Sequence, residues 1–373
     1  MKKFLIAALA TTTAVSAHAG TINFDARADY DSKTYDESNL ADTSQFYFKT
    51  VRLDYQGKAT DDLTFRLRAA YNKAGTATTG AGDNSQTALE FAYLTHKMGD
   101  MFSLQVGKLG SEYGAIESQT SGADLYLTSQ AYTKQGVVGI GATNSSTLVG
   151  GYLSTSSLLY VMGAKLIFNM TPDQNLSLVV FKTPDVATSG AVAPAATTSN
   201  AMMEGLIYKG LFMDKNLRVM ASYHMGTGNV PSTDDKFTLY SAGITYNFGG
   251  YVLAGVDYTN SAYERDGDGA KDSIYSIIGK VAYTGWEQWV PRLEVIASEE
   301  KVETNATAAN NGTNKFMGYG AVVEYKPIAD TTFRYHIAYS NTTEKFDGRT
   351  TNPADAKVDQ ITVGARWNAD FLK

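Results

Sequence analysis

Residues 22–30 read INFDARADY, and every second residue of this stretch is apolar, small or aromatic. The residues between them are Asn, Asp or Arg. A period of two places alternate side chains on opposite faces of an extended chain, whereas a helix would scatter them around its surface. The stretch therefore predicts a β-strand with one apolar face and one polar face.

The same alternation recurs along the whole chain. It returns at residues 63–71 and 333–340, and turn residues separate about 18 such segments between the N-terminal and C-terminal regions. The short segments at 136–144 and 147–154 are the least distinct of them, because two short runs can form one strand. We therefore expect an all-β chain of about 16 to 18 strands.

The composition excludes several classes of protein. The 373 residues include no Cys and only 4 His, and 32 Lys and Arg stand against 38 Asp and Glu, for a net charge of -6. Disulfide frameworks and cysteine-based zinc sites are excluded, and a broadly basic surface for nucleic acid is absent. We expect no metal, no cofactor and no nucleic-acid partner.

Residues 1–19 have the pattern of a secretory signal peptide. Two lysines follow the initial methionine, residues 4–10 are apolar, and Ala17-His18-Ala19 supplies the small-x-small sequence before a cleavage point. The apolar run is far shorter than the roughly 20 residues that a spanning helix needs. We expect a leader at 1–19 and one exported domain at 20–373, in which 30 basic and 38 acidic residues give a net charge of -8.

The connections between the predicted strands distinguish a membrane barrel from a soluble sandwich. Long connections such as 31–45, 74–86 and 110–135 alternate with short ones such as 58–61 and 99–100. This rhythm is typical of an antiparallel transmembrane β-barrel with short periplasmic turns and long extracellular loops. A Greek-key sandwich does not keep it.

Aromatic residues support the same architecture. Barrel strands carry rings of Tyr, Phe and Trp where lipid meets water. Ten aromatic side chains fall nearer to the ends of the predicted strands than to their centres: Tyr30, Tyr55, Tyr71, Phe248, Tyr251, Tyr258, Tyr283, Tyr325, Tyr339 and Trp367.

With these features the chain resembles the bacterial outer-membrane porins over its mature length. Residues 89–117, LEFAYLTHKMGDMFSLQVGKLGSEYGAIE, look like the strand-turn-strand and following loop of the phosphate-selective porins. Glu112-Tyr113-Gly114 is similar to the Pro-Glu-Phe-Gly element in the constriction loop of general porins, with Ser111 in place of the proline. The resemblance implies an outer-membrane homotrimer in contact with the lipid bilayer and lipopolysaccharide, and a loop at 110–135 that folds into the lumen.

Two sets of charged residues are candidates for the pore. If the apolar faces meet lipid, the polar faces line the lumen, and the first three strands together with the closing strand contribute a basic wall: Arg27, Arg52, Arg66, Arg68 and Arg366. The presumed constriction loop contributes Glu112, Glu117 and Asp124. Opposed charges across a narrow passage would impose a transverse field on water and ions. The alternative is that the arginines pair with carboxylates on their own wall: Asp25, Asp29 and Asp54.

The predicted function is passive diffusion of small hydrophilic solutes and ions across the outer membrane. Because the chain and its loop are acidic, the sequence favours a weakly cation-preferring or unselective channel. Two alternatives remain open. One is an anion-preferring or phosphate-preferring porin in which the basic wall dominates, and the other is a structural or adhesive barrel with a plugged lumen.

The sequence does not predict an enzyme. His96, His224 and His336 take the lumenal phase of their strands, and a general base needs a nucleophile or acid within hydrogen-bond reach. No local sequence supplies such a partner, so we expect no catalytic residue.

Overall fold

The structure is a computed structural model of the chain. It describes residues 20–36, 41–74, 85–133, 160–182, 202–227, 236–264, 271–303, 311–329, 331–348 and 355–371. The predicted signal peptide lies outside these residues. So do the segments 136–144 and 147–154, where the alternation predicts strands.

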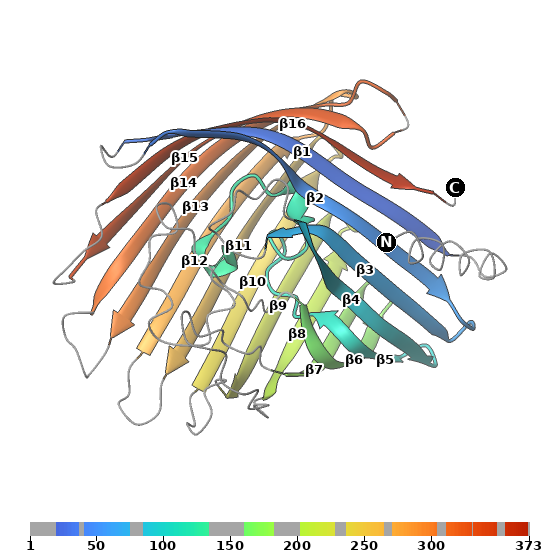
Figure 1. Cartoon of the computed structure of the whole chain (residues 1–373). Helices are drawn as coiled ribbons and strands as arrows, with labels where there is room; N and C mark the ends of the chain where they lie inside the picture. The colour runs from blue at the N-terminus through green and yellow to red at the C-terminus, as the bar shows by residue number, and fades with distance from the viewer. Residues whose placement is uncertain are drawn as a thin grey trace.

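The described residues form sixteen antiparallel strands that close into a single barrel (Figure 1), which confirms the expected fold. The strands are β1 (Thr21–Tyr35), β2 (Thr43–Lys58), β3 (Leu63–Ala74), β4 (Ser85–Met98), β5 (Phe102–Gly110), β6 (Tyr160–Thr171), β7 (Gln174–Lys182), β8 (Met202–Phe212), β9 (Leu217–Thr227), β10 (Lys236–Phe248), β11 (Val252–Glu264), β12 (Lys271–Tyr283), β13 (Trp289–Glu303), β14 (Gly312–Tyr325), β15 (Arg334–Asp347) and β16 (Ala356–Asp370). None of the helices in the described part of the chain is long and apolar enough to cross a membrane.

β1 closes the barrel by pairing with β2 on one side and with β16 on the other. The pairing with β16 runs from Asn23 opposite Asp370 to Tyr35 opposite Val358. Closure leaves no strand edge unpaired, which a membrane requires of any β structure. Turns such as 99–101 and 172–173 are short, and the connection from β5 to β6 is the longest in the barrel.

The two faces of each strand differ as the alternation predicts. On β16, Ile361, Val363 and Trp367 are exposed on the outside, whereas Thr362 and Arg366 between them are buried inside. Aromatic pairs form on the outside toward both ends of the strands: Tyr30 with Phe46, Trp367 with Phe24, and Trp289 with Tyr325. The outside is therefore an apolar band with aromatic borders.

The segment after β5 lies inside the barrel. Residues 111–133 carry the short helices η1 (Gly122–Asp124) and α2 (Gln130–Thr133) and cross the interior (Figure 1). Tyr113 and Ala115 pack into an apolar cluster with inward side chains of β7 to β11, among them Phe181 and Met203. On this side the wall presents a group of apolar side chains that the loop covers.

A β-bulge in β4 changes the phase of that strand. Arg68 of β3 lies opposite Phe91 and Ala69 lies opposite Leu89, which leaves Glu90 as the extra residue. A bulge reverses the alternation beyond it. Phe91 therefore faces the lumen, and His96 lies exposed on the outer face. The expectation that His96 faces the lumen was wrong for this reason.

Candidate functional site

Arginines from four strands hold one end of the loop. The Asp124 carboxylate pairs with Arg334 and Arg366, and Arg292 Nη1 donates to the Asp124 carbonyl at 3.1 Å. Burial would raise the pKa of the Asp124 carboxyl, but Arg366 and Arg334 outweigh it and hold the pKa below its usual value. The remaining arginine, Arg27, donates to the preceding carbonyl of the loop, that of Ala123, at 2.6 Å.

Two of the five predicted wall arginines lie beneath the loop. Arg27, which is 2% exposed, donates to Asp29 Oδ1 at 2.9 Å, and its guanidinium lies 4.1 Å from the centre of the Tyr126 ring. Arg366 Nε donates to Asp25 Oδ1 at 2.9 Å. Both arginines face inward from the strands that close the barrel, and both pair with carboxylates of their own wall.

The opposite end of the loop is held by β10 and β11. The Asp257 carboxylate accepts backbone N–H groups from Ala115 at 2.8 Å, Ile116 at 2.6 Å and Glu117 at 3.3 Å. Ser241 Oγ accepts the N–H of the residue before them at 2.7 Å. Backbone donors that have no partner within the loop are thus satisfied by the wall.

Glu117 closes the loop upon itself. Its two oxygens accept the Ser129 N–H at 2.7 Å and the Ser129 hydroxyl at 2.6 Å. Burial raises the pKa of the Glu117 carboxyl to about 7, although the Ser129 hydrogen bonds act in the opposite direction. Glu117 is buried, so this acidic residue is turned into the loop.

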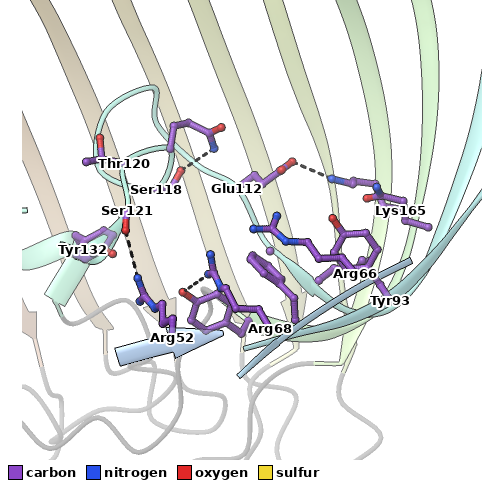
Figure 2. Close-up of a pocket in the computed structure, with 17 residues that line it drawn as sticks. Arg52, Arg66, Arg68, Tyr93, Glu112, Ser118, Thr120, Ser121, Tyr132 and Lys165 are labelled. Atoms are coloured by element: carbon purple, nitrogen blue, oxygen red, sulfur yellow. Dashed lines mark hydrogen bonds and ion pairs between the residues drawn. The ribbon is translucent and has the colours of Figure 1, made fainter. Parts of the chain in front are cut away.

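The other three predicted arginines border a cavity of about 290 Å³ between β2 to β6 and the loop (Figure 2). Arg66 Nε donates to Asp54 Oδ1 at 3.0 Å. Arg52 and Arg68 each place Nε 2.9 Å from the same oxygen of Glu90. All three guanidinium groups therefore line the cavity while they are paired with carboxylates of their own wall.

One aromatic ring contacts the guanidinium groups of two of these arginines. The guanidinium groups of Arg66 and Arg68 lie 4.5 Å and 4.2 Å from the centre of the Phe91 ring. Arg68 Nη2 also donates to the Tyr160 hydroxyl at 2.9 Å. Cation–π contact and hydrogen bonding therefore fix both side chains in position.

Glu112 is the predicted loop acid that faces the cavity. Its carboxylate lies 3.0 Å from Lys165 Nζ and 2.8 Å from Lys209 Nζ (Figure 2 shows the Lys165 contact). Burial would raise its pKa, but the two ammonium groups outweigh it and lower the pKa to about 2. Neither lysine was predicted from the sequence. The available signal was a single charge among the apolar inward residues of a strand.

Further cavities adjoin the first. One of about 510 Å³ shares Arg66 and Tyr93 with it, and two of about 280 Å³ and 160 Å³ share Gln119 with it. Eight basic side chains line the four: Lys58, Arg52, Arg66, Arg68, Lys165, Lys209, Arg218 and Lys280. Two acidic side chains line them: Glu112 and Asp173.

No group of three or more His, Asp or Glu side chains within the described ranges could hold a metal ion. The described histidines inside the barrel are buried in the wall. His336 Nε2 lies 2.9 Å from Asp29 Oδ1, and His224 packs beside Phe181.

Comparison with known proteins connects this architecture to a family. A family model described as phosphate-selective porin O and P matches residues 21–205, just under half of the chain. No curated protein sequence matches the chain.

Solved structures match almost the whole chain. The outer membrane channel DcaP of Acinetobacter baumannii is 11% identical, with 94% of this chain and 97% of that chain covered and a TM-score of 0.65. An anion-selective porin from Comamonas acidovorans is 11% identical, with 94% of this chain and 100% of that chain covered and a TM-score of 0.63. OmpT of Vibrio cholerae in its trimer form is 14% identical, with 94% of this chain and 100% of that chain covered and a TM-score of 0.56. These likenesses establish the fold of an outer-membrane porin barrel, and together with the family match over residues 21–205 they support a channel for diffusion of solutes across the outer membrane.

Proposed function

We propose that this porin lets small hydrophilic solutes diffuse passively and prefers anions, with the loop at 110–135 as its constriction. The observation that carries the proposal is the lining of the four adjoining cavities, with eight basic and two acidic side chains. A passage lined by one sign of charge between low-dielectric walls concentrates counter-ions of the other sign.

The acidity of the loop, on which the predicted cation preference rests, has little access to these cavities. Glu117 is enclosed by the loop, and Asp124 is paired with Arg334 and Arg366. Glu112 borders a cavity but is neutralised by two lysines. The description of the matching family as phosphate-selective is in line with an anion preference.

The test is the reversal potential of single channels in a planar bilayer under a potassium chloride gradient. We expect the sign of an anion-selective channel. A cation-selective sign would overturn the proposal and favour the weak cation preference predicted from the sequence. Folded protein without any conductance would favour a plugged barrel.

Two matched variants test whether the side chains that line the cavities cause the anion preference. Arg218 borders two of the cavities, whereas Lys271 is on the outer face, half exposed and 3.4 Å from Glu264. Arg218→Gln should reduce the chloride-to-potassium permeability ratio about twofold or more, and Lys271→Gln, with the same change in net charge, should leave it unchanged. Equal changes in the permeability ratio of the two variants would mean that the net charge of the protein, and not the lining of the cavities, sets the preference.

The homotrimer and the contact with lipopolysaccharide that the resemblance implies belong to the proposal as well. Chemical crosslinking of the protein in outer-membrane fractions, followed by electrophoresis without heating, tests the trimer. A monomer as the largest crosslinked species would contradict it.

A further inference from the structure

Two lysines from different strands converge on one carboxylate inside the barrel. Lys165 of β6 lies 3.0 Å from Glu112 Oε2, and Lys209 of β8 lies 2.8 Å from Glu112 Oε1. Each oxygen therefore has an ammonium group of its own. Because β7 lies between the two lysine strands, the ammonium groups face each other across a gap that one carboxylate spans.

This cluster lies where two cavities meet. Glu112 and Lys165 border the cavity of about 290 Å³, and Lys209 borders the adjoining cavity of about 280 Å³ together with Arg218. Gln119 borders both. The side chains of Glu112 and Lys209 are 23% and 31% exposed, so a solute in either cavity can reach them.

The backbone of Glu112 has a φ of 51°, in the left-handed region that favours glycine. A residue with a side chain keeps such a conformation only where its surroundings impose it. The contacts with Lys165 and Lys209 are such surroundings, since they fix the side chain from two sides.

We propose that Lys165 and Lys209 form a binding site for small oxyanions such as carboxylates, and that Glu112 is its tethered occupant, which a permeating anion displaces. The inference rests on the proposed function, because it names the point at which passing anions bind. Ammonium-to-carboxylate hydrogen bonds are among the strong ones in proteins, and two such donors match the two oxygens of a carboxylate.

A tethered competitor suits a channel. Conduction requires that a solute bind well enough to enter and weakly enough to leave. A carboxylate on the same chain acts at an effective concentration of about millimolar or more, so it returns to the lysines as soon as the solute moves on. Its pKa of about 2 keeps it ionised at every pH at which the barrel would be measured.

The experiment compares the wild type with Glu112→Gln in a planar bilayer, using potassium acetate as the probe. The variant retains the shape of the side chain but removes the charge that competes for the lysines. We expect a severalfold rise in the acetate-to-potassium permeability ratio and a fall of roughly tenfold in the acetate concentration that half-saturates conductance, because the open fraction of the site rises. Glu204→Gln, on the exposed outer face of β8, is the matched control and should behave as the wild type.

A triple variant tests the lysines and the fold together. Glu112→Gln with Lys165→Gln and Lys209→Gln should lose the gain while the heat-modifiable band of the folded barrel persists. An unchanged permeability ratio and half-saturation in Glu112→Gln would overturn the inference, and so would a gain that survives in the triple variant.

The outcomes separate the two proposals. A cation-selective wild type refutes the proposed function, and a shift toward acetate in Glu112→Gln would still support the lysine site. An anion-selective wild type with an unresponsive Glu112→Gln supports the proposed function and refutes the lysine site.

Discussion

Among single residues, Glu117 makes the attachment of the loop sensitive to pH. Burial raises the pKa of its carboxyl to about 7 in the folded chain. A folded-state pKa above the unfolded value stabilises the protein fully below about pH 4, and this stabilisation is lost as the pH rises through about 7. We expect the free energy of unfolding to fall by up to about 3 kcal/mol between about pH 5 and about pH 8, measured by thermal unfolding in detergent.

Glu117→Gln provides the control for this prediction. Its amide is uncharged at every pH and can still hydrogen-bond with Ser129, whose N–H and hydroxyl both contact Glu117. Its stability should therefore be nearly independent of pH over the same interval. A wild-type profile as flat as that of the variant would contradict the assignment to Glu117.

Within a single element, β16 depends on having no side chain at Gly364. This residue lies opposite Asp29 on β1 and His336 on β15. The gap lets His336 Nε2 come within 2.9 Å of Asp29 Oδ1 across the strand between them. A Cβ at this position would overlap both the Ala28 carbonyl oxygen and Asp29 Oδ1, and it would lie 2.7 Å from His336 Nε2. Gly364→Ala should therefore destabilise the barrel by about 1–3 kcal/mol in urea unfolding with detergent.

A second glycine on the barrel interior offers a matched substitution. At Gly320 of β14 the atom nearest to an added Cβ is the Tyr339 carbonyl oxygen at 3.3 Å, so a small shift accommodates it. Gly320→Ala should cost clearly less than Gly364→Ala. Equal losses would mean that loss of glycine from a strand, and not the crowding around Gly364, sets the effect.

For the whole molecule, selectivity should follow the local charge of the lining rather than the net charge of -6. Fields from lining charges are screened over about 10 Å at 0.1 M salt and about 3 Å at 1 M. The anion preference should therefore weaken steadily as reversal potentials are measured at higher mean salt with the same concentration ratio. A preference that does not change with salt would indicate close-range binding alone and no contribution from the field of the wall.

The barrel followed from local pattern. The alternation in residues 22–30 predicts both the strand β1 and the inward direction of Arg27, and both are observed. The register of neighbouring strands is not local, and it placed the bulge at Glu90. The prediction for His96 failed at that point, and Phe91 was missed as a lining residue for the same reason.

The candidate site was predicted less completely from the sequence than the barrel was. Arg52, Arg66 and Arg68 border a cavity, whereas Arg27 and Arg366 are covered by the loop. Lys165 and Lys209 could not be assigned from sequence, because their common partner belongs to a different segment. The partner is fixed only when the loop has folded back into the barrel.

The sequence by itself determined the strands, their two faces and the closed membrane barrel, because a period of two acts between neighbouring residues and needs no distant contact. Only the tertiary structure decided which charges reach open space. That depends on contacts between residues far apart in the chain, such as Ile116 with Asp257 at a separation of 141 and Asp124 with Arg334 at 210. Those contacts pair Asp124 with arginines of the wall, whereas Glu117 is enclosed by the loop and Glu112 borders a cavity beside two lysines.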